Sequence, residues 1–468
     1  MAFAARVPVP MLDVFILTFN AAKNEINVPV FARRLYKAFG ESASTLPELI
    51  VISLQEMAPL ATAFVGSTLI EPYFQKYISA VNSATARFAV QRERRRPPTE
   101  DLYTLVGLRN VGMTGIMLFA RKPATLRNLR TAEVGFGPGE MANKGAVGLR
   151  VLYSRTSMDG TAGETELTFV ATHLSAMEPN LEKRNRNWET IVSGLVFEEA
   201  EELAPLQCPR PNDQVQESTL GAVRNGSIYK PGTHLFVAGD LNYRISRIAP
   251  QTGSSFPNNY PGSPNYFMHF IVRDQLTAEK AAGRTLHGLS EAPVHFPPTY
   301  KLLHTPLERE PGDQDPDSDE VEWSYASHRW PSWCDRVLFL DVPWWARAKA
   351  GIGQMKVTAY NATPAVRSSD HKPVFLRLDV PIIAPADLAP TQAAYESAQR
   401  PLPGQLLDPR IKLPFPVSAR FRQHRPSVRR WESTIGWSIL LTQSNYNAVV
   451  LFTVLLVGLT AWWFRRSE

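Results

Sequence analysis

Residues 234–244 read HLFVAGDLNYR, an apolar run that ends abruptly in polar residues. Five further runs share this design: LDVFILTFN (12–20), ELIVISLQE (48–56), LTFVATHLSA (167–176), CDRVLFL (334–340) and VRSSDHKPVFLRL (366–378). Continuous apolar runs of this kind are typical of strands buried on both faces. Between them, MTGIMLFAR (113–121) and KGAVGLRVLY (144–153) alternate as sheet strands do. Polar groups gathered at strand ends predict an α/β sandwich with an active site at that edge.

The polar residues at these strand ends are suited to phosphate chemistry. A phosphate ester repels nucleophiles, so its hydrolysis needs a cation and preorganised donors. Mg2+ prefers carboxylate and amide oxygens, which makes Glu56 the natural ligand with Asn20 beside it. Asp240 is placed to orient the attacking water, and Asn242 to hold a phosphoryl oxygen.

Two histidines extend this constellation. His371 is a candidate to stabilise the pentavalent phosphorane, as an imidazolium or by donating a hydrogen bond, with Asp335 as the carboxylate that orients it. His173 is a second phosphate donor. A single Asn or His at a strand end is usually structural, so the interpretation depends on the whole set. The chain has no Cys-x5-Arg loop, which excludes a cysteine-nucleophile phosphatase.

From about residue 11 to residue 379 the sequence resembles the inositol polyphosphate 5-phosphatases of the exonuclease–endonuclease–phosphatase superfamily. The resemblance is carried by TFN (18–20), LQE (54–56), NKGAV (143–147), THLSA (172–176), GDLNYR (239–244), PPTYK (297–301), PSWCDRVL (331–338) and SDHKPV (369–374). The GDLNYR and WCDRVL motifs are the most specific of these. Nuclease-like members of the superfamily lack PTYK and WCDR.

The resemblance implies a four-layer α-β-β-α sandwich of the DNase I-like type and in-line hydrolysis by water, without a covalent intermediate. It implies roles for the following residues: Asn20 and Glu56 hold Mg2+, Asp240 activates water, Asn242 and His173 contact the scissile phosphate, His371 pairs with Asp335, and Asp370 completes the polar site.

A set of cationic and aromatic residues resembles the clamp that binds a neighbouring 4-phosphate in this family: Lys144, Tyr300, Lys301, Arg336 and Lys372. Fixed positive donors suit such a phosphate. Arg244 is open to two interpretations, a ligand contact or a brace for the Asp240 loop. Val237 and Ala171 depart from the residues common in the family, Trp and Asn, at positions that affect packing.

Composition limits the other possibilities. The 468 residues include 44% hydrophobic and 20% charged residues, which excludes wholesale disorder. Two cysteines, Cys208 and Cys334, make neither a disulfide framework nor a four-cysteine zinc site. Seven basic residues and no acid lie in residues 410–430, so the net charge of +6 leaves −1 for the rest of the chain. This local charge argues against a general nucleic-acid-binding role.

The C-terminal end predicts a membrane anchor. Residues 448–464 read AVVLFTVLLVGLTAWWF without a charge, and seventeen residues of helix measure about 26 Å, close to the thickness of a thin bilayer core. The alternative is a buried helix, although the run lacks a polar stripe. The start of the chain does not resemble a secretory signal. We therefore expect a tail anchor in the endoplasmic reticulum membrane with a cytosolic catalytic domain, the mitochondrial outer membrane being the alternative host.

The expected organisation is a catalytic domain at 11–380, a Pro-rich and basic linker at 381–446, a transmembrane helix at 447–464 and a short tail at 465–468. The basic segment 410–430 is expected to attract anionic lipid, the alternative being a merely solvated linker. Two polar stretches, 199–232 and the acidic 306–322, are predicted to be surface insertions.

These observations favour an Mg2+-dependent phosphatase that removes the 5-phosphate of a phosphoinositide in a membrane, phosphatidylinositol 4,5-bisphosphate above all, giving phosphatidylinositol 4-phosphate. Nucleic acid is not an expected partner. The alternatives are another hydrolase of the superfamily (a soluble inositol polyphosphate phosphatase, a sphingomyelinase or a nuclease) and a catalytically inactive tether that binds phosphoinositides. The last requires the loss of catalytic residues, and all of them are present.

Overall fold

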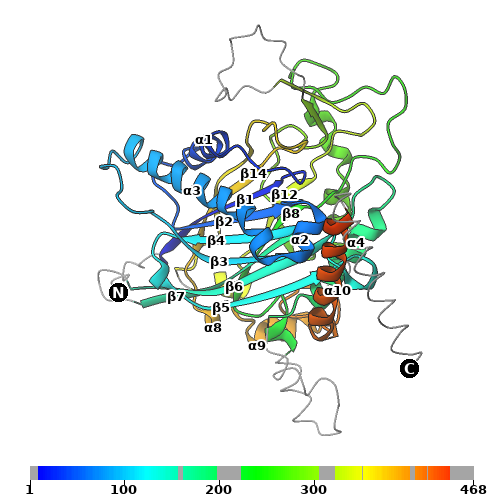
Figure 1. Cartoon of the computed structure of the whole chain (residues 1–468). Coiled ribbons are helices and arrows are strands. Elements are labelled where there is room, and N and C mark those ends of the chain that lie inside the picture. The colour runs from blue at the N-terminus through cyan, green and yellow to red at the C-terminus, as the bar shows by residue number, and fades with distance from the viewer. Residues whose placement is uncertain are drawn as a thin grey trace, which may run out of the picture.

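The computed structural model describes residues 9–156, 162–197, 223–304, 322–349, 351–400, 406–418 and 420–442. Two six-stranded sheets dominate this part of the chain (Figure 1). The first has the order β13 (Lys356–Ala362), β14 (Val374–Pro381), β1 (Met11–Asn20), β2 (Leu49–Gln55), β4 (Thr114–Ala120) and β3 (Thr104–Val111). The second has the order β5 (Leu126–Gly135), β6 (Gly145–Thr156), β7 (Ala162–His173), β8 (Thr233–Asp240), β12 (Asp335–Leu340) and β9 (Leu289–Ser290). A separate hairpin pairs β10 (Leu302–His304) with β11 (Trp323–Tyr325).

Helices and short 3-10 turns connect and cover the strands. The helices are α1 (Val28–Phe39), α2 (Leu60–Val65), α3 (Glu71–Gln91), α4 (Leu181–Gly194), α6 (Gln275–Ala281), α7 (Trp344–Arg347), α8 (Pro385–Leu388), α9 (Gln392–Ala398) and α10 (Arg420–Thr442). The 3-10 turns are η1 (Ser67–Leu69), η2 (Pro123–Thr125), η3 (Pro138–Glu140), η5 (Phe267–His269) and η6 (Ile271–Arg273).

Successive side chains of a strand point to opposite faces, and β1 buries both of its faces. Ile16 lies in the core between the two sheets, together with Phe169 of the second sheet. Phe15 lies on the outer face, where it shares a core with Phe31 of α1 and Tyr77 of α3. Burial on both faces explains why the central strands read as continuous apolar runs.

The outer face of the second sheet is covered in the same way. Trp188 of α4 and Leu276 of α6 pack in one core with Val237 of β8 and Leu338 of β12. The layers therefore run helix, sheet, sheet, helix. The predicted four-layer α-β-β-α sandwich is confirmed.

In the part that the structure describes, the region predicted as a Pro-rich and basic linker at 381–446 is partly helical. It contains α8, α9 and α10, and Leu388, Ala394 and Ile411 pack in one core with Trp345. Proline does not prevent these helices from forming. Pro385 occupies the first turn of α8, where the missing N–H has no helical partner to lose, and Pro426 lies inside α10.

Several predicted segments lie wholly or mostly outside the described residues. These are the membrane span at 447–464, the tail at 465–468, most of the insertion at 199–232 and nearly all of the acidic insertion at 306–322. Among the helices that are described, none combines the length and the apolar character needed to cross a membrane.

Candidate active site

The register of three strands brings His173, Asp240 and Asp335 side by side. In the parallel pair β7–β8, His173 is the partner of Asp240. In the antiparallel pair β8–β12, Asp240 is the partner of Asp335. The approach is close, because a Cβ added at Gly239 would meet the backbone oxygen of Thr172 at 2.0 Å. Glycine before Asp240 is therefore required for the two strand ends to meet.

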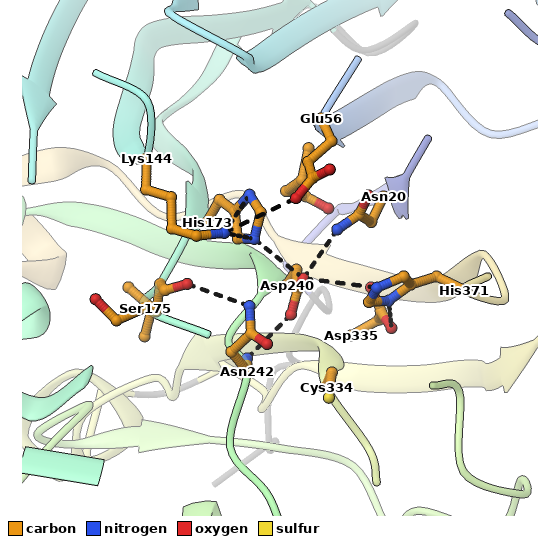
Figure 2. Close-up of polar contacts among 12 residues, drawn as sticks. Asn20, Glu56, Lys144, His173, Ser175, Asp240, Asn242, Cys334, Asp335 and His371 are labelled. Atoms are coloured by element: carbon orange, nitrogen blue, oxygen red, sulfur yellow. Dashed lines mark hydrogen bonds and ion pairs between the residues drawn. The ribbon is translucent and has the colours of Figure 1, made fainter. Parts of the chain in front are cut away.

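Asp240 is the centre of the site (Figure 2). Asn20 donates its Nδ2–H to Asp240 Oδ2 over 2.9 Å, and His173 Nε2 lies 3.2 Å from the same oxygen. His371 Nε2 is 3.9 Å away on the opposite side. Burial alone would raise the pKa of Asp240, but His173, His371 and Lys144 outweigh it and hold the pKa well below its usual range. Asp240 is therefore an ionised carboxylate.

His371 and Asp335 form a buried pair beside Asp240. His371 Nδ1 lies 2.9 Å from Asp335 Oδ2, which also accepts the hydroxyl of Thr299 over 2.6 Å. Burial lowers the pKa of His371, but the carboxylates of Asp335, Asp240 and Asp370 outweigh it and raise the pKa to about 9. The histidine is therefore an imidazolium near neutral pH, and its Nε2–H faces Asp240.

Lys144 lies next to both His173 and Glu56. Its Nζ contacts Nε2 of His173, lies 3.3 Å from Nδ1 of the same ring and lies 4.0 Å from Glu56 Oε1. Burial lowers the pKa of Lys144, even though Asp240 and Glu56 oppose the shift. Burial and Lys144 lower the pKa of His173, so this second histidine is neutral. The two histidines that flank Asp240 thus carry different charges.

Glu56 follows β2 with a backbone φ of 44°, a left-handed conformation that is uncommon outside glycine. This turn places its carboxylate 3.3 Å from Lys23 Nζ as well as near Lys144. Lys23 was not among the predicted site residues, and nothing in the motifs pointed to it.

Arg244 is a brace, which decides between its two interpretations. Its Nε–H donates to the backbone oxygen of Asn242 over 3.1 Å, and its Nη2 contacts the Asn242 side-chain oxygen. Asn242 also donates its backbone N–H to Asp240 Oδ1 over 3.1 Å and its amide to the Leu174 oxygen over 3.2 Å. The guanidinium lies 4.4 Å from the centre of the Tyr300 ring. Arg244 therefore fixes the amide of Asn242 next to Asp240.

Tyr300, Lys301 and Asp370 form the other side of the site. The rings of Tyr300 and His371 are 4.4 Å apart, and Lys301 Nζ contacts Asp370 Oδ2. Asp370 Oδ1 lies 4.0 Å from His371 Nε2. Both Lys301 and Asp370 keep about a quarter of their side-chain surface exposed, so they are accessible to a ligand.

The site thus has two parts. The floor consists of the buried residues Asn20, His173, Asp240, Asp335 and His371. The rim consists of the partly exposed residues Glu56, Lys144, Tyr300, Lys301 and Asp370.

The prediction that Arg336 belongs to the substrate clamp is wrong. Its guanidinium is buried and makes ion pairs of 2.6 Å with Glu291 and 3.0 Å with Asp274. Arg336 follows Asp335 on β12, so the two side chains leave opposite faces of the strand. Because Asp335 points into the site, Arg336 points away from it.

Lys372 also differs from its predicted place in the clamp. It follows His371, and its Nζ lies 3.7 Å from the centre of the Trp323 ring. Burial lowers its pKa to about 7. Lys372 therefore serves packing against the β10–β11 hairpin, while the rim keeps Lys144, Tyr300 and Lys301 as candidate phosphate ligands.

Two hydroxyl groups in the quoted motifs support the site, although neither was predicted to do so. Thr299 of PPTYK donates to Asp335. Ser369 of SDH donates to the Asn20 backbone oxygen over 2.5 Å and accepts the His371 backbone N–H over 3.0 Å. Their position inside the motifs was the available signal.

The donor groups fit a divalent cation at Glu56 and Asn20. Asn20 is in register with Gln55 in the parallel pair β1–β2, so the two oxygen donors lie at adjacent strand ends, as a hard cation prefers. A second group, Asp240, Asp335 and His371, has its ligand atoms within 4.8 Å of one another. That group fits less well, because His371 is protonated and bonded to Asp335.

A family model described as Endonuclease/Exonuclease/phosphatase family 2 matches residues 17–377, more than half of the chain. The chain belongs to this family. The predicted resemblance to the inositol polyphosphate 5-phosphatases is also confirmed, because its curated relatives carry such names.

Three relatives show the extent of the similarity. The chain is 27% identical over 343 residues to type II inositol polyphosphate 5-phosphatase 14 of Arabidopsis thaliana, covering 70% of this chain and 27% of the relative. It is 29% identical over 263 residues to phosphatidylinositol 3,4,5-trisphosphate 5-phosphatase 2B of Danio rerio, covering 56% of this chain and 17% of the relative. It is 26% identical over 335 residues to polyphosphatidylinositol phosphatase INP53 of Saccharomyces cerevisiae, covering 70% of this chain and 23% of the relative. The chain spans less than a third of the length of these relatives.

A solved structure shares the fold. It is the inositol polyphosphate 5-phosphatase domain of SPsynaptojanin in complex with inositol (1,4)-bisphosphate and calcium ion. The TM-score is 0.52 at 21% identity, and the match covers 79% of this chain and 84% of that one.

Proposed function

We propose that this member of the family is a divalent-metal-dependent phosphatase that removes the 5-phosphate of phosphatidylinositol 4,5-bisphosphate by direct attack of water. One observation carries the proposal. The ionised Asp240 lies between neutral His173 and protonated His371, with Asn20 donating to the same carboxylate oxygen. The names of the relatives support a phosphorylated inositol as the substrate class.

Glu56 and Asn20 would hold Mg2+, whose preference for carboxylate and amide oxygens matches them. When bound, the cation withdraws charge from the phosphoryl oxygens and lowers the pKa of a bound water. Lys23 and Lys144 lie within 4.0 Å of the Glu56 carboxylate and offset part of its charge.

The chain's own residues account for the other steps. Asp240 orients the water for attack in line with the leaving oxygen and takes up its proton, which passes to the inositol oxygen as the P–O bond breaks, so that the inositol leaves as a hydroxyl. The neighbouring Nε2–H of His371 is a charged donor for the phosphoryl oxygens, and Asp335 keeps the ring protonated and fixed. The amide of Asn242, held by Arg244, and the ring of His173 are further donors beside the scissile phosphate.

The rim supports recognition of a second phosphate. Lys301 Nζ lies 5.4 Å from the centre of the Tyr300 ring, which lies against His371. Lys144 Nζ contacts His173. A 4-phosphate adjacent to the scissile group requires fixed cations of this kind. A nuclease or a sphingomyelinase would not require them at this place.

The test is phosphate release by the full chain from vesicles that contain phosphatidylinositol 4,5-bisphosphate and Mg2+. We expect release that is lost on chelation and in Asp240→Asn. Soluble inositol 1,4,5-trisphosphate, sphingomyelin vesicles and supercoiled plasmid are parallel substrates. Absence of release from every 5-phosphorylated compound would reject the proposal, whereas plasmid nicking would favour the nuclease. An Asp240→Asn variant that kept every cellular effect would favour the inactive tether.

We further propose that residues 448–464 anchor the enzyme in the endoplasmic reticulum membrane, with the catalytic domain in the cytosol. The uncharged composition of this run supports the proposal. Of the basic segment 410–430, Lys412 and Arg430 are exposed and available to anionic lipid, whereas Arg425 is buried in ion pairs. Recovery of the full chain from cells in the alkaline-extracted supernatant, rather than in the membrane pellet, would reject the anchor.

A further inference from the structure

Helix α10 contacts the loop that carries Lys144 and also helix α2, which follows Glu56, although its sequence belongs to the segment expected to be a linker. Figure 1 shows it in red beside α2 and α4 at one end of the sheets. Its Gly436 sits on α2, since an added Cβ would meet the backbone oxygen of Ala61 at 2.8 Å and the backbone nitrogen of Val65 at 3.0 Å. Glycine permits this close approach between the two helices.

Glu432 of α10 is buried, with 3% of its surface exposed. Its Oε1 accepts the backbone N–H of Ala142 over 2.7 Å. Its carboxylate also receives two hydrogen bonds from Arg425, of 2.9 and 2.7 Å, and Arg425 continues to Glu133 on β5 over 2.7 Å. A buried carboxylate is costly unless it is paired in this way.

Ala142 precedes Lys144 by two residues in the loop between β5 and β6. The loop is closed by its own backbone bonds, from the Phe136 N–H to the Lys144 oxygen over 2.9 Å and from the Gly137 N–H to the Met141 oxygen over 2.7 Å. Glu432 accepts the N–H of Ala142, which neither of these two backbone bonds uses. The bond to Glu432 therefore fixes the segment from which Lys144 reaches His173 and Glu56.

The second contact of α10, between Gly436 and α2, also lies close in sequence to a rim residue. Helix α2 begins at Leu60, four residues after Glu56, so packing of Gly436 on α2 bears on the loop that presents the Glu56 carboxylate. The two rim residues whose side chains lie 4.0 Å apart, Lys144 and Glu56, are thus supported from behind by one helix.

We propose that α10 is a positioning element of the active site and that Glu432 is a positioning residue, which acts through Ala142 on Lys144 without touching the substrate. The proposal rests on the proposed function for its kinetic consequence. Its structural consequence, immobilisation of residues 136–144, is independent of any activity.

The structural consequence is tested by hydrogen exchange of the full chain without substrate. We expect Glu432→Leu to speed exchange about tenfold or more in peptides that cover residues 136–144, because the Ala142 amide loses its acceptor. Peptides from β7 and β8 are expected to exchange as in the wild type. Glu432→Gln keeps an acceptor oxygen and is expected to restore most of the protection. Arg429→Leu is the matched control, because Arg429 lies on α10 and contacts Glu133 but not the loop.

The kinetic consequence is mainly a rise in KM, about tenfold in Glu432→Leu. Lys144 is displaced as a phosphate ligand in this variant, while the floor is intact. Gly436→Val provides a second route, since it separates α10 from α2, and it is expected to speed exchange in residues 56–66. If exchange in both loops is unchanged in both variants, or if it rises equally across β7 and β8, the proposal is overturned. If the wild-type protein shows no activity, only the proposed function is rejected. The exchange experiment would still test whether α10 positions the loop.

Discussion

The floor and the rim of the site are built in different ways. The floor residues His173, Asp240 and Asp335 are neighbours because β7, β8 and β12 pair in one register. The rim residues Glu56 and Lys144 lie on loops, and one helix more than 270 residues further along the chain supports both loops. Strand register thus positions the floor, whereas the rim depends on loops and on the packing of a distant helix.

This comparison predicts that substitutions in the floor affect turnover, whereas substitutions of the rim cations Lys144 and Lys301 affect substrate affinity. The largest effect is expected for Asp240→Asn. The amide has nearly the shape of the carboxylate but neither accepts a proton nor carries charge, so kcat should fall about 1,000-fold or more with little change in KM. Steady-state kinetics on vesicles measure the effect, with circular dichroism as the check of folding. A loss confined to KM would contradict the division between floor and rim.

The second prediction concerns Arg336, which resembles a clamp residue in sequence and is structural in the fold. Arg336→Met leaves Asp274 and Glu291 buried without their partner, which should cost about 3–5 kcal/mol of the free energy of unfolding. Denaturant unfolding measures the loss. KM at a temperature where the variant is still folded should match the wild type. An increased KM with unchanged stability would return Arg336 to the clamp.

The third prediction separates the two members of the buried pair. Asp335→Asn removes the largest contribution that holds the pKa of His371 near 9, so the imidazolium loses its proton at lower pH. We expect kcat to fall about 100-fold and the alkaline limb of the pH–rate profile to move to lower pH. A limb that stays in place would mean that His371 is not the group that titrates there.

The smallest effect is expected at the rim. Lys301→Met removes one partly exposed ammonium, so KM for phosphatidylinositol 4,5-bisphosphate should rise about tenfold with the free energy of unfolding changed by less than about 1 kcal/mol. Phosphatidylinositol 5-phosphate, which lacks the 4-phosphate, provides the control, because its KM should change less. Equal changes for both lipids would place Lys301 at the scissile phosphate instead.

The sequence was sufficient to predict that the floor residues meet, but it did not predict that helix α10 supports the rim. Asp240 and His173 each follow an apolar run directly, so their meeting at one sheet edge can be predicted from strand patterning. The error at Arg336 was avoidable, because Asp335 and its successor must leave opposite faces of one strand. The bond from Glu432 to Ala142 joins residues 290 positions apart, and no local pattern in either segment indicates it.

Helix α10 also changes how the catalytic domain is joined to the residues beyond Thr442. Twenty-three residues of α-helix measure about 35 Å, and contacts with α2, α4 and β5 hold this rod against the sandwich. The chain therefore leaves the catalytic domain at Thr442, from the end of a helix that is packed on the sandwich. If residues 448–464 lie in a bilayer, only the five residues 443–447 separate them from the end of α10, so the sandwich is held close to the lipid surface.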